Sequence, residues 1–425
     1  MSLWGFRFLL WYICVMFVQP QNRFTFLWPL HIADLTFIGA LVLHGLSCLE
    51  ARRPLIRFGP GTVLGCALLL SAFLSQHFGF YQMSASWNPT IDYLAKNALL
   101  LILIEATATT VERVWAVQMV ALFSTLWWVK GGLRLSALGA TYSGDRLMGA
   151  AVSLIDNPNG FAYMMCLFLP LYLYAYQQAV RKWVKWSFLA CALAAVYIVF
   201  QTGSRTGLVT LIAMGAFLLP YYGKNHFRAL AVIALALVFI FPLTGEKNLQ
   251  RFRTIPASVA SFFSQSNAKS PGQMNQDEQS ADERKRKNRD TWELIKTYPA
   301  FGVGVFADQS KYADRFPMAV GQVHCEILMA GRMMGLIGMG LYAGFIALIV
   351  SGGGWARRHA RHWPAVRDLG WTLQVQGVAL IVGGAFSPHP WHPPTMIMAG
   401  CASALMVNLK EEQARRNQQR AGQVC

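Results

Sequence analysis

One histidine and one arginine lie where they could act on an anionic substrate. His324, in the segment VGQVHCEIL, precedes a long glycine-rich apolar run. An ordinary histidine titrates at ~6.5, so His324 could accept a proton near neutral pH, or it could serve as a polar cap at a membrane surface. Arg205 lies between two glycines in TGSRTG. The glycines would let the backbone approach an anion closely, and a helix that starts there would offer free N–H groups to it. Alternatively, Arg205 could simply close a helix, with its charged end at the lipid surface.

A second arginine belongs to a polar stretch, SADERKRKNRDTWELIKTYP, that reads as a helix. Ser280 and Glu283 fit a capping box at its start, and Pro299 ends it. Arg289 and Trp292 then share one face of this helix. An amphipathic helix lying on the lipid surface is an equally good description, and it would leave Arg289 able to bind a ligand.

Several other polar residues lie close to these in the sequence. Glu326 follows His324 by two positions, a spacing that does not bring side chains together on a helix. For the same reason adjacent Cys325 is not expected to form a nucleophilic pair with His324. The asparagines of DNPNG are expected to cap a helix, with hydrogen bonding to a sugar or phosphate as the alternative. The accessory candidates are Glu326, Arg332, Asn157, Asn159 and Arg146.

Motifs for metals and nucleotides are missing from the sequence. There is no DxD, HExxH, P-loop or GxSxG pattern. His389 and His392 lie close together in SPHPWHPP, without a neighbouring carboxylate or cysteine to complete a metal site. We therefore expect neither a metal nor another cofactor.

The elements that must position these residues are predicted to be membrane helices. The chain has 425 residues, 55% of them hydrophobic and 13% charged, with a mean hydropathy of +0.36. About twelve apolar spans of membrane length follow one another. Residues 1–243 would hold nine of them, 244–332 a long polar loop with amphipathic helices, 333–409 three more spans, and 410–425 a tail. The N-terminal apolar run is expected to be the first span and not a removed signal peptide.

Charge predicts how the helices are oriented. The net charge of +17 is explained by basic loops on alternate connections, so nucleic acid is not an expected partner. Both termini would be cytoplasmic, and the 244–332 loop would lie outside. Basic residues predicted on the outer side run against this bias and suggest an anionic ligand there. They include Lys130, Arg134, Arg146, Arg205 and the cluster from Arg284 to Arg289. Residues 264–281 carry almost no apolar side chains and are expected to be poorly ordered.

Taken together, these motifs resemble a known family. DNPNG before a span, TGSRTG at the next outward turn, an arginine followed by Trp and YPAFGVGVF, then a histidine and AGRMMGLIG are similar to the O-antigen ligase family of the Wzy_C superfamily. The resemblance covers roughly residues 157–345. One departure is that relatives usually have His-Asn where this chain has His324-Cys325.

The resemblance implies a GT-C-type membrane glycosyltransferase in the bacterial inner membrane. Such an enzyme would move a glycan from undecaprenyl diphosphate to the lipid A–core of lipopolysaccharide on the periplasmic side, without a metal. By motif, Arg205 and Arg289 would bind the diphosphate and His324 would be the base. Fixed arginines can stabilise a departing diphosphate, and direct displacement would invert the anomeric carbon.

Three alternatives differ in what they would act on. A polysaccharide polymerase or a protein O-oligosaccharyltransferase would differ only in its acceptor, which the sequence does not reveal. A membrane transporter would have charges near the midplane and often internal repeats. Here the charges gather at the outer boundary and no repeat is visible, which favours the enzyme.

Overall fold

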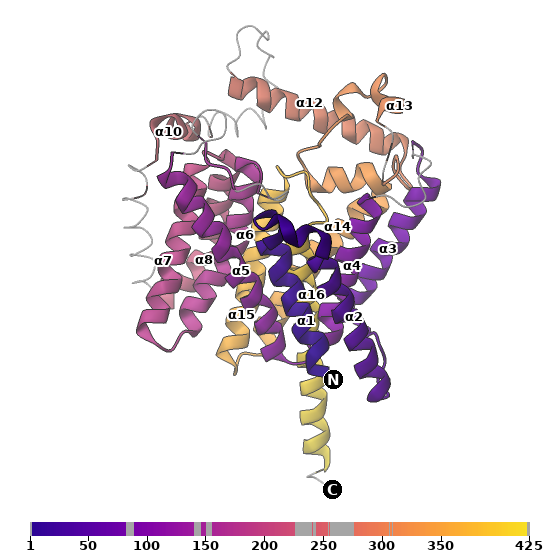
Figure 1. The fold of residues 1–425 in the computed structure, drawn as a ribbon, viewed down its shortest axis with the longest axis vertical. Coiled ribbons are helices and arrows are strands. Elements are labelled where there is room, and N and C mark those ends of the chain that lie inside the picture. The colour runs from indigo at the N-terminus through magenta and orange to yellow at the C-terminus, as the bar shows by residue number, and fades with distance from the viewer. Residues whose placement is uncertain are drawn as a thin grey trace.

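The computed structural model describes residues 2–81, 89–139, 146–149, 155–225, 240, 244–253, 255, 276–305, 307 and 309–422. They form a helical bundle with both ends of the chain at one end and a separate layer of helices at the other (Figure 1). The bundle helices are α1 (Ser2–Val18), α2 (Ile32–Glu50), α3 (Pro60–Phe78), α4 (Pro89–Thr107), α5 (Val111–Ala137), α6 (Pro158–Gln178), α7 (Lys182–Gln201), α8 (Arg205–Asn225), α14 (Glu326–His359), α15 (Pro364–Gly384) and α16 (Pro393–Gly422). The predicted helical membrane class is therefore confirmed.

Five of the described helices are long and apolar enough to cross a membrane. Their spans are Leu3–Asn22, Thr25–Glu50, Pro60–Phe78, Lys182–Gln201 and Glu326–His359. The predicted total of about twelve spans stays a prediction, and the predicted span at 227–243 lies, except for Ile240, outside the described residues. Arg57, between α2 and α3, pairs with Glu411 of α16 at 2.7 Å. The orientation expected from charge stays a prediction.

The helix starts follow from proline and asparagine. Proline occupies the first turn of α3, α6 and α15, where its missing N–H costs no hydrogen bond. Asn157 caps α6 by accepting from the Gly160 N–H at 2.8 Å. The helix cap predicted from DNPNG is confirmed.

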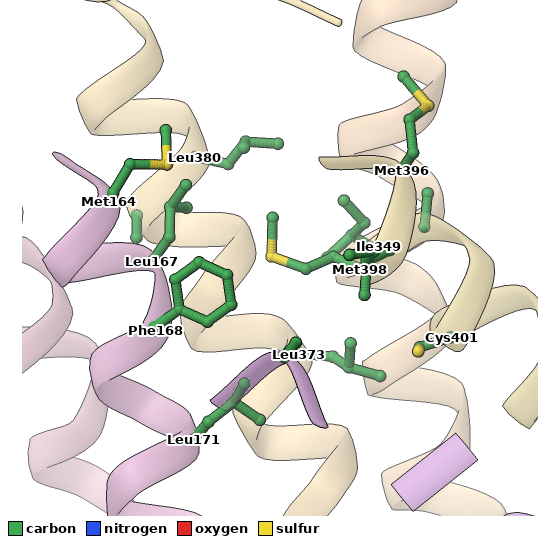
Figure 2. Packing of buried hydrophobic residues seen from close by; sticks show 14 of the residues in the cluster. Met164, Leu167, Phe168, Leu171, Ile349, Leu373, Leu380, Met396, Met398 and Cys401 are labelled. Carbon is green, nitrogen blue, oxygen red and sulfur yellow. The ribbon is translucent and has the colours of Figure 1, made fainter. Parts of the chain in front are cut away.

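The centre of the bundle is packed from four helices that are distant in sequence (Figure 2). Met164 and Phe168 of α6 lie opposite Leu380 of α15, while Ile349 of α14 and Met398 of α16 close the other side. Helix α6 is buried along nearly its whole length. Because α6 is packed tightly on all sides, its N-terminal end is held in a fixed position next to the polar loops.

The outer layer has a small apolar core of its own. Helix α12 (Gln276–Thr297), helix α13 (Ser310–Ala313) and the 3₁₀ helix η4 (Pro317–Ala319) pack around Leu294, Val303, Tyr312, Phe316 and Ala319. A further helix, α10 (Glu246–Arg253), lies beside α8 (Figure 1).

The structure corrects two expectations about the start of α12. The helix begins four residues before Ser280, so the predicted capping-box start is wrong; an apolar face that packs lower down can extend a helix beyond its local signal. Residues 276–281, expected to be poorly ordered, are helical, whereas 264–275 lie outside the described residues.

A kink divides α14 near its outer end. Met334 and Gly335 leave helical geometry, with φ 65° and ψ −155° at Gly335. The turn at residues 299–303 then satisfies the freed backbone groups: Leu336 N–H donates to Pro299 O at 2.8 Å, and Val303 N–H donates to Arg332 O at 3.0 Å. The Ser75 hydroxyl of α3 donates to Met333 O at 2.6 Å. The motifs YPAFGVGVF and AGRMMGLIG therefore fit together as one backbone joint.

Candidate active site

His324 lies just before the start of α14, at the end of the bundle far from the termini. Its imidazole is half-buried beneath α12 and close to His389. Burial, together with the positive charges of Arg284 and Lys287, lowers the pKa of His324 to about 4. The ring is therefore neutral at neutral pH and can accept a proton.

The two faces of α12 carry different basic residues. Lys287 lies on the inner face, half-buried, and pairs with Glu283 at 3.0 Å. The same face continues into Thr291 and Leu294, which are fully buried. Arg289 lies on the opposite face with its side chain 73% exposed, next to Asp290. The structure therefore brings Arg284 and Lys287 to His324, but not Arg289.

Glu326 points into the bundle, away from the solvent. Its carboxylate is fully buried and accepts hydrogen bonds from Tyr342 of α14 and, at 3.3 Å, from Tyr163 of α6. His392, which precedes α16, places its Nε2 3.6 Å from the other oxygen. This cluster joins α6, α14 and the start of α16, so it fixes the floor beneath His324.

Arg205 opens α8 at the same end of the bundle and is half-buried. The preceding turn needs Gly203, which has φ 57°, and a Cβ there would lie 2.1 Å from the Asn248 side-chain oxygen. Arg146 joins this turn to the start of α6, because it donates to Thr202 O at 3.0 Å and to Asn159 Oδ1 at 2.8 Å. Arg205 and the DNPNG asparagines are thus held in neighbouring turns.

Arg332 has a local structural task. It is 6% exposed, and one guanidinium nitrogen donates to Ala319 O at 2.8 Å and Gly321 O at 2.6 Å. These bonds hold the segment between η4 and His324 against α14. Arg332 therefore anchors the loop that carries the histidine, and its predicted accessory role in the site stays a prediction.

Three residues near His324 were not assigned to the site from the sequence, although two of them belong to the basic cluster expected to attract an anion. Arg284 and Lys287 lie seven and four residues before Thr291, and the burial of Thr291 in the structure places them on the inner face of α12. His389 faces both His324 and Asp156, although the sequence suggested only a structural use for it. Within the described ranges, no group of three or more His, Cys, Asp or Glu side chains is placed to hold a metal ion.

Cys325 occupies the N-cap position of α14, and its side chain makes no capping hydrogen bond. Burial raises the pKa of its thiol, which keeps the group protonated and unsuited to nucleophilic attack. The asparagine usual in relatives of this type is a strong N-cap residue. Because position 325 is the N-cap of α14, an asparagine there could cap the helix.

We expect Cys325→Asn to stabilise the protein by about 1 kcal/mol, because the new amide would accept from an N–H in the first turn of α14. Thermal unfolding in detergent measures the change. Cys325→Ala provides the control, since it removes the thiol without adding a cap. Equal melting temperatures for the Asn and Ala variants would contradict this explanation.

A comparison with known families agrees with the geometry. Residues 189–343, about a third of the chain, match a family model described as O-antigen ligase. This range contains TGSRTG, α12, His324 and the kink of α14. It confirms the resemblance to this family that the motifs predicted. No curated protein matches the sequence.

Proposed function

We propose that this protein of the O-antigen ligase family transfers a glycan from undecaprenyl diphosphate to the lipid A–core of lipopolysaccharide, at the periplasmic face of the inner membrane. The observation that carries the proposal is the neutral His324 lying beneath two cations of α12. A base beside fixed positive charges suits a reaction in which a hydroxyl loses its proton while a diphosphate departs. The family match and the apolar helices support the substrate class and the membrane setting.

The proposed reaction is a single displacement. The acceptor hydroxyl attacks the anomeric carbon of the donor glycan as the bond to the diphosphate oxygen breaks. His324 takes the hydroxyl proton, and the diphosphate leaves with the bonding electrons. One direct displacement inverts the anomeric carbon.

The cations have separate positions around the leaving group in this proposal. Arg205 would contact the diphosphate from the start of α8, and Arg284 and Lys287 would contact it from α12. The family resemblance assigns this contact to Arg289, but its side chain lies on the outer face of the helix. We therefore assign the diphosphate contact to Arg284 and Lys287, and we use Arg289 as the control residue.

Purified protein with a lipid-linked donor and a lipid A–core acceptor tests the function directly. We expect glycan transfer, and Lys287→Ala should lower donor affinity roughly tenfold or more, because a charge-assisted hydrogen bond contributes about 1.5–3 kcal/mol. Arg289→Ala, on the same helix, should change donor affinity by less than about twofold, as for exposed charges.

Three results would contradict the residue assignment or the proposed function. A large loss in Arg289→Ala with none in Lys287→Ala would return the diphosphate contact to Arg289. Efficient transfer to a second lipid-linked glycan, but not to lipid A–core, would show a polymerase instead of a ligase. Movement of the lipid-linked glycan across the bilayer without any transfer would favour a transporter.

A further inference from the structure

A cavity with a basic rim opens at the outer end of α5. Its volume is ≈ 260 Å³, and its walls include Arg23, Trp127, Lys130, Arg134 and Ile155. The Ser136 hydroxyl, near the end of α5, lies 3.0 Å from that of Tyr197, near the end of α7. Because α7 leads directly into the turn before Arg205, the cavity lies at the same end of the bundle as the candidate active site.

Positive charge is concentrated around one aromatic ring of this cavity. The Arg23 guanidinium lies 5.2 Å from the centroid of the Trp127 ring, and the Lys130 ammonium lies 5.3 Å from it. Arg134 follows Lys130 by one helical turn and lines the same space. No acidic residue is among the described residues that line the cavity. Three like charges held together in this way favour an anionic ligand.

The cavity lies at the level expected for a lipid-borne sugar. Three exposed aromatic residues adjoin Arg23, namely Phe24, Phe26 and Trp28, and aromatic residues of this kind gather at membrane–water boundaries. Lys130 and Arg134 also run against the charge bias expected for the outer side. A basic cluster retained there against that bias indicates a use beyond orientation.

A short covalent path connects the cavity with the candidate active site. Ile155 lines the cavity and comes two residues before Asn157, the cap of α6. The second turn of α6 carries Tyr163, which holds Glu326 beneath His324. A ligand seated on Trp127 would therefore lie beside the helix that fixes the floor of the active site.

We propose that this cavity binds an anionic sugar of the acceptor, a phosphorylated or carboxylated saccharide carried on a lipid. Its face would stack on an aromatic ring of the cavity, and its acidic group would contact Arg23, Lys130 and Arg134. That the bound glycolipid is the acceptor rests on the proposed glycan transfer. The binding of an anionic glycolipid in this cavity does not depend on that transfer. The cavity would thus determine which acceptors are accepted, and His324 would act on them.

The test uses the full-length protein in nanodiscs of neutral lipid and one core glycolipid in two forms, with and without its phosphates. Wild-type protein should bind the phosphorylated form about tenfold or more tightly than the dephosphorylated form, as one charge-assisted contact would provide. Lys130→Gln/Arg134→Gln should remove this preference. In the transfer assay the same variant should raise the acceptor KM by a similar factor, with kcat and the donor KM unchanged.

Lys182→Gln is the matched control, because Lys182 is an exposed lysine at the opposite end of the bundle. It should keep the preference for the phosphorylated form. Equal binding of both glycolipid forms by the wild type would overturn the proposal. So would loss of the preference when phosphatidylglycerol is added at the level of the glycolipid, since the cavity would then hold an ordinary phospholipid headgroup. Preference without any transfer would support the anionic-glycolipid site while refuting the proposed glycan transfer.

Discussion

Replacing His324 by Ala should lower the transfer rate by roughly 10²–10⁴ while donor affinity stays nearly unchanged. The variant loses the group that takes the acceptor proton, but it keeps the cations proposed to hold the diphosphate. Single-turnover transfer measures the rate, and donor binding without acceptor measures the affinity. A parallel loss of donor affinity would make His324 a binding residue instead.

The pH profile gives this prediction a second test. Because burial and two cations lower the pKa of His324 to about 4, kcat/KM should stay level from about pH 8 to pH 5 and fall only below that. An unperturbed histidine, as expected from the sequence, would already lose activity near 6.5. A bound diphosphate would offset the positive charges, so the profile of kcat should fall at a higher pH than that of kcat/KM.

The lowered pKa of His324 also makes the stability of the folded protein depend on pH. The folded pKa lies below the unfolded value, so the unfolded chain binds the proton first as the pH falls. The contribution of His324 to stability is therefore present above about 6.5 and lost as the pH falls toward 4. His324→Gln is the control, because it cannot titrate. Near-normal transfer by this variant, with an unchanged pH profile, would remove His324 from the base role.

Gly335→Ala should cost at least about 3 kcal/mol and leave little folded protein. Gly335 has φ 65° and ψ −155°, a conformation that essentially only glycine adopts. A Cβ would also lie 2.3 Å from Pro299 O and 2.7 Å from Ala300 O. These atoms belong to backbone that is already hydrogen-bonded to α14, so they cannot move aside. The yield of monodisperse protein and its thermal unfolding in detergent measure the loss.

Gly340→Ala is the matched control on the same helix. A Cβ at Gly340 meets nothing within 4 Å, so alanine there should be neutral or stabilise the helix by up to about 1 kcal/mol. Equal behaviour of the two variants would show that the kink does not depend on glycine. Normal folding of Gly335→Ala with altered transfer would instead mean that α14 can straighten without unfolding the bundle.

The local features of the site followed from the sequence better than its long-range contacts. The Asn157 cap could be predicted, because it depends on residues within one turn. The side of α12 that faces His324 could not, because the buried Thr291 and Leu294 set the helix phase by packing on the small outer core. The proposed contact of Arg289 used the motif alone, and the motif carries no information about that phase.

The kink and the buried carboxylate show the same limit. The glycines of AGRMMGLIG were visible, but the carbonyls that approach Gly335 come from a turn more than thirty residues earlier. Glu326 looked like a neighbour of His324, whereas its partner Tyr163 comes from α6 and its partner His392 from the segment before α16. Contacts of this kind depend on the arrangement of the whole bundle, which a single sequence does not specify.

The backbone joint between residues 299–303 and α14 decides from which direction a substrate can arrive. Helix α12 ends at Thr297, two residues before that joint, so its C-terminal end is tied to α14 and to Ser75 of α3. Its other end carries Arg284 and Lys287 and has no comparable backbone tie among the described residues. If the helix swings, it must pivot near Pro299, and the passage to His324 then widens from the N-terminal end of α12. The donor diphosphate would meet the two cations before it meets the base, which orders binding ahead of chemistry.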